Sequence, residues 1–223
     1  MPRLLLLVLV LLAGPLRAQP NGGGAPALNG RVEGGVYVSP TGLFRIAVPV
    51  LPELGGSIND TANVVTFQDG FNVHVSIGVF PQDATQRWEY STRGVKDYLP
   101  YFFANFVMSD FRQLFPGAEI ESARFSPEVL GGTLIVYTLL PGGSMFGDKH
   151  AVLGADATPP VAKRGNMVFV RSGSIYVIST ELAERVIERS SYKKTTAEED
   201  ELLRRRLDDI VLKMVFVRQP GDK

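Results

Sequence analysis

The sequence contains no cysteine, and this absence excludes several kinds of protein at once. Without thiols the chain cannot form a disulfide framework, a thiol nucleophile or a zinc–cysteine site. Histidine is also scarce, because His74 and His150 are the only two in the chain. A histidine-based metal site would need both of them, or one together with carboxylates. We therefore expect neither a metal nor a cofactor.

A dominant charge is also missing, since 23 basic residues face 23 acidic ones. A nucleic-acid-binding domain needs a strongly basic face. The sequence has no P-loop, and it has no G-x-G-x-x-G motif in a strand–helix–strand setting. These absences argue against a nucleic-acid partner and against the common nucleotide-binding folds.

The first 18 residues read as a secretory signal peptide. Arg3 precedes an apolar run over 4–13, and the segment 16–18 gives a plausible cleavage site before Gln19. The run is too short to span a bilayer, which takes about 20 residues. The alternative is an uncleaved anchor. Cleavage would leave 21 basic against 23 acidic residues, a formal charge of −2, and no predicted transmembrane span.

An exported chain without cystines is more typical of the bacterial envelope than of small secreted eukaryotic domains, because a chain of this length can build a sufficient core unaided. We expect a periplasmic or secreted protein. Residues 19–35 are rich in Gly, Asn and Pro and predict a flexible linker. A single globular domain is then predicted over 36–218, followed by a tail over 219–223.

Residues 93–116 are the most aromatic stretch after the leader and predict a long helix. Their apolar residues recur at helical spacing. Pro100 conflicts with a continuous helix, because proline lacks an N–H and clashes with the preceding turn. We therefore expect the helix to begin near Leu99, with 93–98 as a separate turn. An aromatic ligand pocket is the alternative to simple packing. The predicted stripe comprises Val95, Leu99, Phe102, Phe103, Phe106, Val107, Phe111 and Leu114.

Alternation and turn dipeptides predict strands on both sides of this helix. Asp69-Gly70 and Ser172-Gly173-Ser174 mark two hairpins. The segment 51–62 reads as a loop or a short helical turn, and 82–92 as a polar lead into the helix. The expected strands cover 36–38, 43–48, 63–68, 71–80, 118–126, 134–140, 166–171 and 175–180.

A second long helix is predicted near the C-terminus. Thr196 and Glu199 have the spacing of a capping box, and the following apolar stripe includes Leu203 and Leu207. Arg204, Arg205 and Arg206 lie among acids, so a solvated face is expected. The resulting fold class is α+β: an antiparallel sheet of about six to eight strands covered by the Phe-rich helix and the C-terminal helix, as in an α/β/α sandwich.

Several segments resemble PsbP-like proteins over about residues 36–218. The likeness lies in the run Gly42-Leu43-Phe44-Arg45-Ile46-Ala47-Val48-Pro49, the strand pair around 65–69 and 73–81, the hairpin at 170–176 and the end of the last helix at 214–216. The resemblance implies an α/β/α sandwich and a non-catalytic protein that serves as an extrinsic partner of membrane complexes. It assigns no functional residue. A cystatin-like fold or another helix-on-sheet fold is the alternative.

Catalytic motifs are weak. Ser144, Asp148 and His150 contain the residue types of a hydrolase triad, but they lie within seven residues and lack the strand–turn–helix setting of a nucleophile elbow. His74 is expected to be a surface or partly buried histidine on the polar face of a strand. A hydrolase is therefore the least favoured reading.

The stretch 141–163 is long for a loop in a compact domain, and such loops are commonly functional or disordered. We place a possible contact loop here, made of Asp148, Lys149, His150, Asp156, Lys163 and Arg164. The sequence thus predicts a non-catalytic exported protein that binds another envelope protein or supports an assembly. The alternative is a small-molecule or lipid-binding module that uses space between the Phe-rich helix and the sheet.

Overall fold

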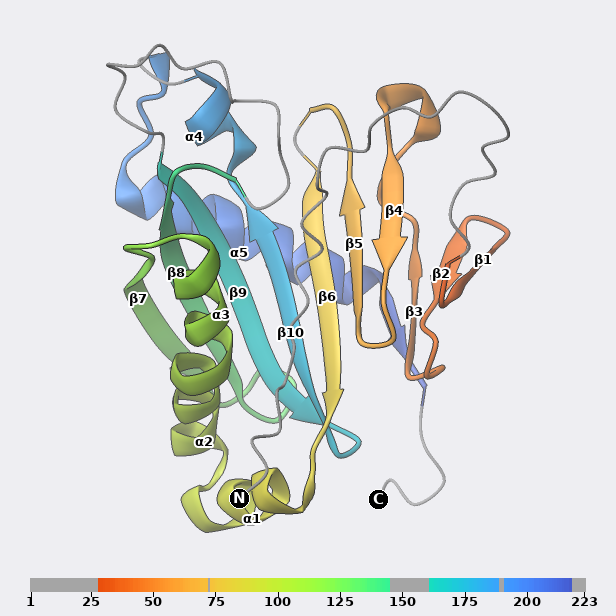
Figure 1. Cartoon of the computed structure of the whole chain (residues 1–223), viewed down its shortest axis with the longest axis vertical. Coiled ribbons are helices and arrows are strands. Elements are labelled where there is room, and N and C mark those ends of the chain that lie inside the picture. Colours follow the sequence, from red (N-terminus) through yellow and green to blue (C-terminus); the bar gives the residue numbers. More distant parts are fainter. Residues whose placement is uncertain (1–27, 72, 145–160, 189–190, 218–223) are drawn as a thin grey trace.

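The structure, a computed structural model, describes residues 28–71, 73–144, 161–188 and 191–217. Within these ranges the strands form two antiparallel sheets (Figure 1). The large sheet has the order β4-β5-β6-β10-β9-β8-β7, and the small one has the order β1-β2-β3-β11. The strands of the large sheet are β4 (Ser57–Asp60), β5 (Val64–Gln68), β6 (His74–Pro81), β7 (Glu119–Ser126), β8 (Thr133–Pro141), β9 (Val161–Arg171) and β10 (Ser174–Glu181).

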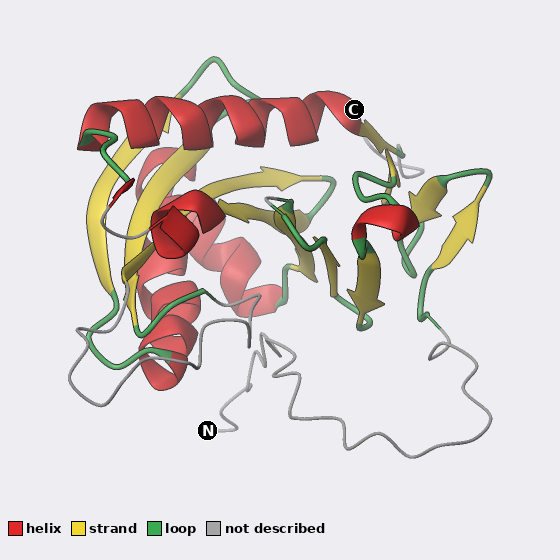
Figure 2. Cartoon of the chain, turned by 90° about the horizontal axis from the view of Figure 1, so that it is seen from above, coloured by secondary structure: helices red, strands yellow, loops and turns green. Residues whose placement is uncertain are grey.

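Helices cover both faces of the large sheet, as the view from above shows (Figure 2). The small sheet is made of β1 (Arg31–Glu33), β2 (Val36–Val38), β3 (Phe44–Ala47) and β11 (Met214–Phe216). The helical elements are the 3-10 turn η1 (Pro52–Leu54), α1 (Ala84–Arg93), α2 (Val95–Phe102), the π-helical turn η2 (Phe103–Val107), α3 (Met108–Leu114), α4 (Ala183–Glu188) and α5 (Thr196–Lys213).

Each face of the large sheet has its own apolar core. On one face Leu203, Leu207 and Ile210 of α5 pack with Ile178 and Phe169. On the other face the side chains of α2, η2 and α3 pack against β8, β9 and β10. Because both faces are covered, the central strands are buried along nearly their whole length, rather than at alternate residues.

The predicted α+β class is confirmed, with an antiparallel sheet between the Phe-rich helix and the C-terminal helix. Three strands lie where none was predicted. One of them, β11, occupies 214–216, which was expected to be the end of the last helix. The other two are β1 and β4. Strand β1 lies within the segment expected to be a flexible linker, and β4 lies within 51–62, expected to be loop or helical turn. Strands β1 and β4 are short and mostly polar, so their sequences show little alternation of apolar and polar residues. Their strand conformation comes from pairing with β2 and β5.

The Phe-rich helix begins at Val95, four residues before the predicted start at Leu99, and Pro100 lies inside it. The prediction of a separate turn over 93–98 was wrong, and the polar lead-in forms α1, which ends at Arg93 with Gly94 as its C-cap. Shortly after the proline the helix widens into the π-turn η2. A π-turn inserts one extra residue, so Met108 is fully buried although it lies outside the predicted stripe.

The N-cap of helix α5 lies one residue before the predicted cap, and the helix itself begins at Thr196. Thr195, not Thr196, accepts the backbone N–H of Glu198, and the Glu198 side chain accepts the Thr195 N–H. The following apolar stripe is confirmed, because Leu203 and Leu207 are completely buried. Close packing is possible because Gly165 of β9 lies beneath these two leucines, where a Cβ would approach within 3.1 Å of Leu203.

The carboxylate of Asp60 joins the two sheets. It accepts the backbone N–H groups of Asn29 at 2.8 Å and Gly30 at 2.7 Å, and the Tyr37 hydroxyl at 2.8 Å. Burial by itself would raise the pKa of Asp60, but these donors outweigh it and hold the pKa below its usual value. The strand β4 of the large sheet is thereby tied to β2 of the small one.

We predict that Asp60→Ala lowers the free energy of unfolding by about 2 kcal/mol near neutral pH, because it leaves the donors of Asn29, Gly30 and Tyr37 without their charged acceptor. Since the folded pKa is depressed, this contribution is complete above the unfolded pKa of about 3.9 and disappears as the pH falls through the folded pKa. Urea unfolding across this pH range measures it. The exposed Asp209→Ala is the control, and a difference that grows in acid would contradict the assignment.

Candidate functional site

The buried charged residues gather at one end of the large sheet, around the beginning of β9. Lys163 is completely buried and Arg164 is 4% exposed. Because successive residues of a strand point to opposite faces, these neighbours enter different layers. Lys163 lies on the face covered by α5, and Arg164 lies on the face covered by α3, where its guanidinium is 5.3 Å from the Phe111 ring centre.

Three carboxylates surround Lys163. Its Nζ pairs with Glu121 of the edge strand β7 and with Glu199 and Asp200 of the first turn of α5, the Glu199 contact being 3.2 Å. Glu199 also forms an ion pair with Arg185 of α4, whose guanidinium nitrogen lies 2.9 Å from the Glu199 carboxylate oxygen. Burial alone would lower the pKa of Lys163, but Asp200 and Glu121 outweigh it and raise that pKa. The cluster thus connects β7, β9, α4 and α5.

Arg164 has a separate set of partners. Its guanidinium donates to Ser76 at 2.7 Å and lies 3.5 Å from the fully buried carboxylate of Glu181. Ser144 donates its hydroxyl to the same carboxylate. Burial lowers the pKa of Arg164, and the charge of Glu181 opposes this effect. The guanidinium is therefore neutralised within the fold by an acid of the neighbouring strand.

This polar group continues as a row across the sheet. Ser76 is the cross-strand partner of Ser179, which is the partner of Asn166 on β9. The Ser179 hydroxyl donates to Asn166 at 2.8 Å. On the other side of Ser76 lies Thr66 of β5. His74, two residues before Ser76, is partly buried on the same face, as predicted for a polar strand face.

The geometry of this row does not form a nucleophilic site from its described members. The Ser144 hydroxyl is directed to Glu181, and that carboxylate already neutralises Arg164. Activation of a serine requires a neighbouring base free to take its proton. Among the described residues, no group of three or more His, Asp or Glu side chains is placed to hold a metal ion. The row instead satisfies the buried polar groups of four strands.

The predicted contact loop divides into two parts. Asp148, Lys149, His150 and Asp156 lie outside the described residues. Lys163 and Arg164 are buried within β9, so their prediction as surface contact residues was wrong. Two adjacent charged residues are typical of a loop, so the strand was predicted to begin only at residue 166. In the structure β9 begins five residues earlier, at Val161, and includes both charges. The acids that neutralise them come from distant segments and give no local signal.

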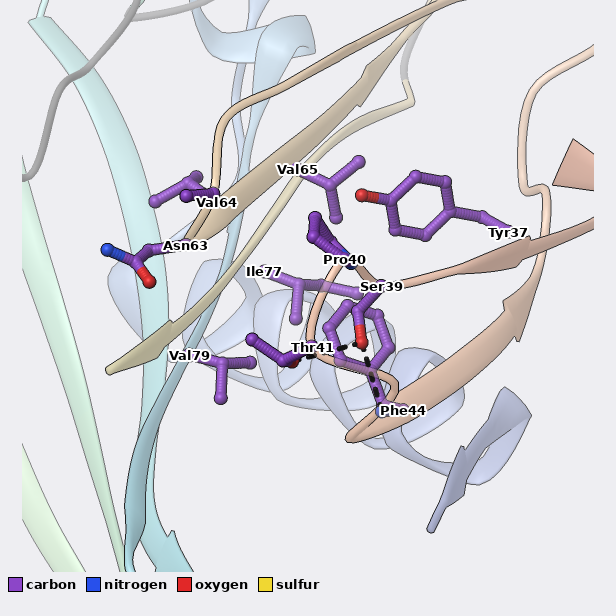
Figure 3. A pocket seen from close by; sticks show the side chains of 11 residues that line it. Tyr37, Ser39, Pro40, Thr41, Phe44, Asn63, Val64, Val65, Ile77 and Val79 are labelled. Carbon is purple, nitrogen blue, oxygen red and sulfur yellow. Dashed lines mark hydrogen bonds between the residues drawn. The ribbon is translucent and has the colours of Figure 1, made fainter. Parts of the chain in front are cut away.

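A small recess lies between the β2–β3 turn and strands β5 and β6 (Figure 3). Thr41 and Val79 are among its lining residues, and its volume of about 10 Å³ matches a single water molecule. Ligand pockets for small molecules are usually several hundred Å³. Phe102, Phe103 and Phe111 of the Phe-rich helix are buried as core, each at most 3% exposed. The recess therefore supplies no ligand site.

Three large apolar side chains are instead exposed together at the end of the sheet where η1 and the β5–β6 turn meet. Leu51 is 52% exposed, Leu54 is 40% exposed and Phe71 is 59% exposed. The two turns are joined by the Gly70 N–H, which donates to the Leu54 carbonyl at 3.0 Å. We call Leu51, Leu54 and Phe71 the apolar knob.

The turns beneath the apolar knob are firmly built. Asp69 accepts the backbone N–H groups of Phe71 at 2.8 Å and of Val73 at 3.0 Å. The Gly56 N–H donates to the Leu51 carbonyl at 2.9 Å, and a Cβ at Gly56 would lie 2.5 Å from that oxygen, so only glycine fits. Sequence reasoning missed this surface, although its Leu-Pro-x-Leu-Gly-Gly turn and the Asp-Gly-Phe turn are both visible.

Comparisons with known proteins found similar solved structures only. No protein-family model and no curated protein matches its sequence. Among solved structures, PsbP of the cyanobacterium Synechocystis is 13% identical, with 92% of this chain and 100% of that chain covered and a TM-score of 0.43. The Ran-binding protein Mog1p of Saccharomyces cerevisiae is 11% identical over 86% of this chain and 97% of that chain, with a TM-score of 0.45.

A protein of Bacteroides thetaiotaomicron is 12% identical, with 86% of this chain covered and a TM-score of 0.39, and the chain spans about half of it, 51%. The fold-level resemblance to PsbP-like proteins that the sequence predicted is found again in this comparison. It concerns the arrangement of the elements, and no functional conclusion rests on it.

We predict that Arg164→Met or Glu181→Gln alone lowers the free energy of unfolding by about 3–5 kcal/mol, because each leaves a buried charge without its partner. In the double variant the free energy of unfolding should fall by clearly less than the sum of the decreases in the two single variants. Urea unfolding of all four proteins gives the coupling energy.

The exposed pair Arg205–Glu201, whose atoms are 3.8 Å apart, is the matched control. Its coupling should be below about 1 kcal/mol. Additive losses at Arg164 and Glu181 would show that the two residues do not act as a pair.

Proposed function

We propose that the protein is an exported, non-catalytic module that binds another protein of the cell envelope through the apolar knob. The observation that carries the proposal is the joint exposure of Leu51, Leu54 and Phe71 on two hydrogen-bonded turns. Single exposed apolar residues are ordinary, but a contiguous group marks an interaction site. Hydrogen bonds that hold the backbone beside these side chains reduce the entropy that is lost on binding.

The negative charge of Glu53, beside the apolar knob, indicates which kind of partner would bind there. Glu53 lies between Leu51 and Leu54 on η1, is exposed and forms no ion pair with the described residues. An anionic lipid surface would repel this carboxylate. A protein pocket with apolar walls and a basic rim would accept both the leucines and the glutamate. We therefore infer that the partner is a protein with such a pocket.

Export is part of the same proposal. It is supported by the leader pattern of residues 1–18 in the sequence. None of the helices in the described part of the chain is long and apolar enough to cross a membrane. Mass spectrometry of the chain isolated from its native cells should give a mature N-terminus at Gln19. An intact N-terminus at Met1 in a cytosolic fraction would contradict export.

The binding surface is tested by the double variant Leu54→Ser, Phe71→Ser. We expect crosslinking of the wild-type protein in envelope extract to give one near-stoichiometric adduct, which the double variant loses by at least about tenfold, because hot-spot side chains dominate binding energy. Mass spectrometry identifies the partner and its crosslinked peptide.

The matched control is Leu212→Ser, since Leu212 is 82% exposed on α5, away from the apolar knob. Its adduct should match that of the wild type. An adduct of equal yield in the double variant would remove the apolar knob from the interface. Far-ultraviolet circular dichroism checks that all variants are folded.

A further inference from the structure

The dipeptide Asn29-Gly30 lies just before β1, directly beside Asp60. Asn29 is exposed, and its amide nitrogen Nδ2 donates to the Asp60 carbonyl at 3.1 Å and to the Asp60 carboxylate at 3.4 Å. The backbone N–H groups of Asn29 and Gly30 donate to the same carboxylate, at 2.8 and 2.7 Å. Asp60 thus binds every hydrogen-bond donor group of this dipeptide.

An asparagine followed by glycine readily loses its side-chain amide by deamidation, and asparagine is among the thermolabile residues. The backbone nitrogen after the asparagine gives up its proton and attacks the side-chain carbon Cγ. The bond from Cγ to Nδ2 breaks, ammonia leaves and a cyclic succinimide forms. Water then opens the ring to aspartate or isoaspartate, so the net change is one water taken up and one ammonia released. Glycine favours the ring closure because it has no side chain to obstruct it.

Asp60 opposes the first step of this reaction. Removing the Gly30 N–H proton would create a negative charge beside a carboxylate that is itself charged, which raises the free energy of the deprotonated nitrogen. The hydrogen bonds of Asn29 also hold its amide against Asp60, and this restrains the rotation that brings Cγ to the Gly30 nitrogen. Succinimide formation therefore requires that the contact with Asp60 opens first.

The fold requires glycine at the second position of the dipeptide. A Cβ on Gly30 would lie 2.5 Å from the Val38 carbonyl oxygen and 2.7 Å from the Tyr37 hydroxyl. Asn29 in turn supplies the donor that binds the Asp60 carbonyl. The reactive dipeptide is thus part of the joint between the two sheets.

Deamidation would turn the attraction between residue 29 and Asp60 into repulsion. An aspartate would put a second carboxylate where Nδ2 lies, 3.4 Å from the Asp60 carboxylate, and like charges this close repel. Isoaspartate would lengthen the backbone between the two N–H groups that share this carboxylate. Strand β1 is the edge strand of the small sheet and pairs with β2, so the bonds to Asp60 tie its start to the large sheet.

We infer that Asn29-Gly30 is a deamidation site that Asp60 keeps unreactive in the folded protein, and that its modification irreversibly detaches the beginning of β1 from the large sheet. The reaction needs only water as a co-reactant. It is one-way because ammonia is lost, so the joint does not recover its original donors. The inference is independent of the apolar knob, since it concerns other residues.

The first test compares rates of deamidation in mildly alkaline buffer. Peptide mapping by mass spectrometry measures the conversion of Asn29 in the folded full chain and in a synthetic peptide of residues 28–33. We expect the folded chain to react at least about tenfold more slowly than the peptide, because the contact with Asp60 has to open first. Asp60→Ala should bring the rate close to that of the peptide. Equal rates in the wild-type chain and the peptide would overturn the inference.

The control for this test is Val168→Ala, which removes buried methyl groups from the core on β9 without touching Asp60. Its Asn29 should react at the wild-type rate. A rise as large as that in Asp60→Ala would show that the rate follows global unfolding, and it would remove the protective role of Asp60. Far-ultraviolet circular dichroism checks that both variants are folded.

The second test measures the detachment of β1. Trypsin cleaves after Arg31, which is exposed in β1, and cleavage within a paired strand requires local opening. Asn29→Asp reproduces one product of deamidation, and we expect its cleavage after Arg31 to be at least about tenfold faster than in the wild type. Asn105→Asp makes the same charge change at an exposed residue of η2 and should leave the rate unchanged. A wild-type rate in Asn29→Asp would contradict the detachment.

Discussion

Two adjacent cations at the start of the central strand β9 impose the main constraint on this fold. Lys163 and Arg164 must point to opposite faces, and both faces are covered by helices. A buried charge without a partner costs several kcal/mol, so each layer has to bring acids to this point. The first turn of α5 and the edge strand β7 supply them on one face, and Glu181 supplies one on the other.

The need to pair Lys163 restricts the positions of α5 and β7, which apolar packing alone would restrict less. Because Leu203 and Leu207 have the same side chain, a shift of α5 along its axis would place one leucine where the other had been. The leucines therefore determine the direction of the helix better than its position along its axis. Glu199 and Asp200 meet Lys163 only when the helix begins at the right height above the sheet. The edge strand β7 is exposed along much of its length, and its contact through Glu121 holds it to the interior. We infer that this charge pairing contributes to the specificity of the α5 register.

The hairpins and the helix stripes could be predicted from the sequence because their signals are local. Ser172-Gly173 marks the β9–β10 turn, and Leu203 and Leu207 repeat at helical spacing. The start of β9 could not be predicted in this way. A lysine followed by an arginine resembles solvated loop, and only the folded chain reveals the distant carboxylates that make burial possible.

The course of the Phe-rich helix shows a different limit. Pro100 is a valid breaker in terms of local sterics, yet the helix continues through it because its aromatic residues gain more from burial on β8 and β9 than one missing hydrogen bond costs. The π-turn that follows changes the phase of the stripe, so Met108 enters the core and Phe106 is left partly exposed. Periodicity read from the sequence assumes one constant pitch, and it fails where the pitch changes.

The contrast between interior and ends bears on function. The polar side chains at the centre of the sheet pair with one another. Ser144 and Arg164 both contact Glu181, and Ser179 donates to Asn166. Large exposed apolar side chains lie at the ends of the sheet, with Leu54 and Phe71 at one end and Trp88 of α1 at the other (Figure 1). The buried polar groups thus fix the register of the fold, and the surface to which we assign the proposed protein contact lies outside this row, at the apolar knob.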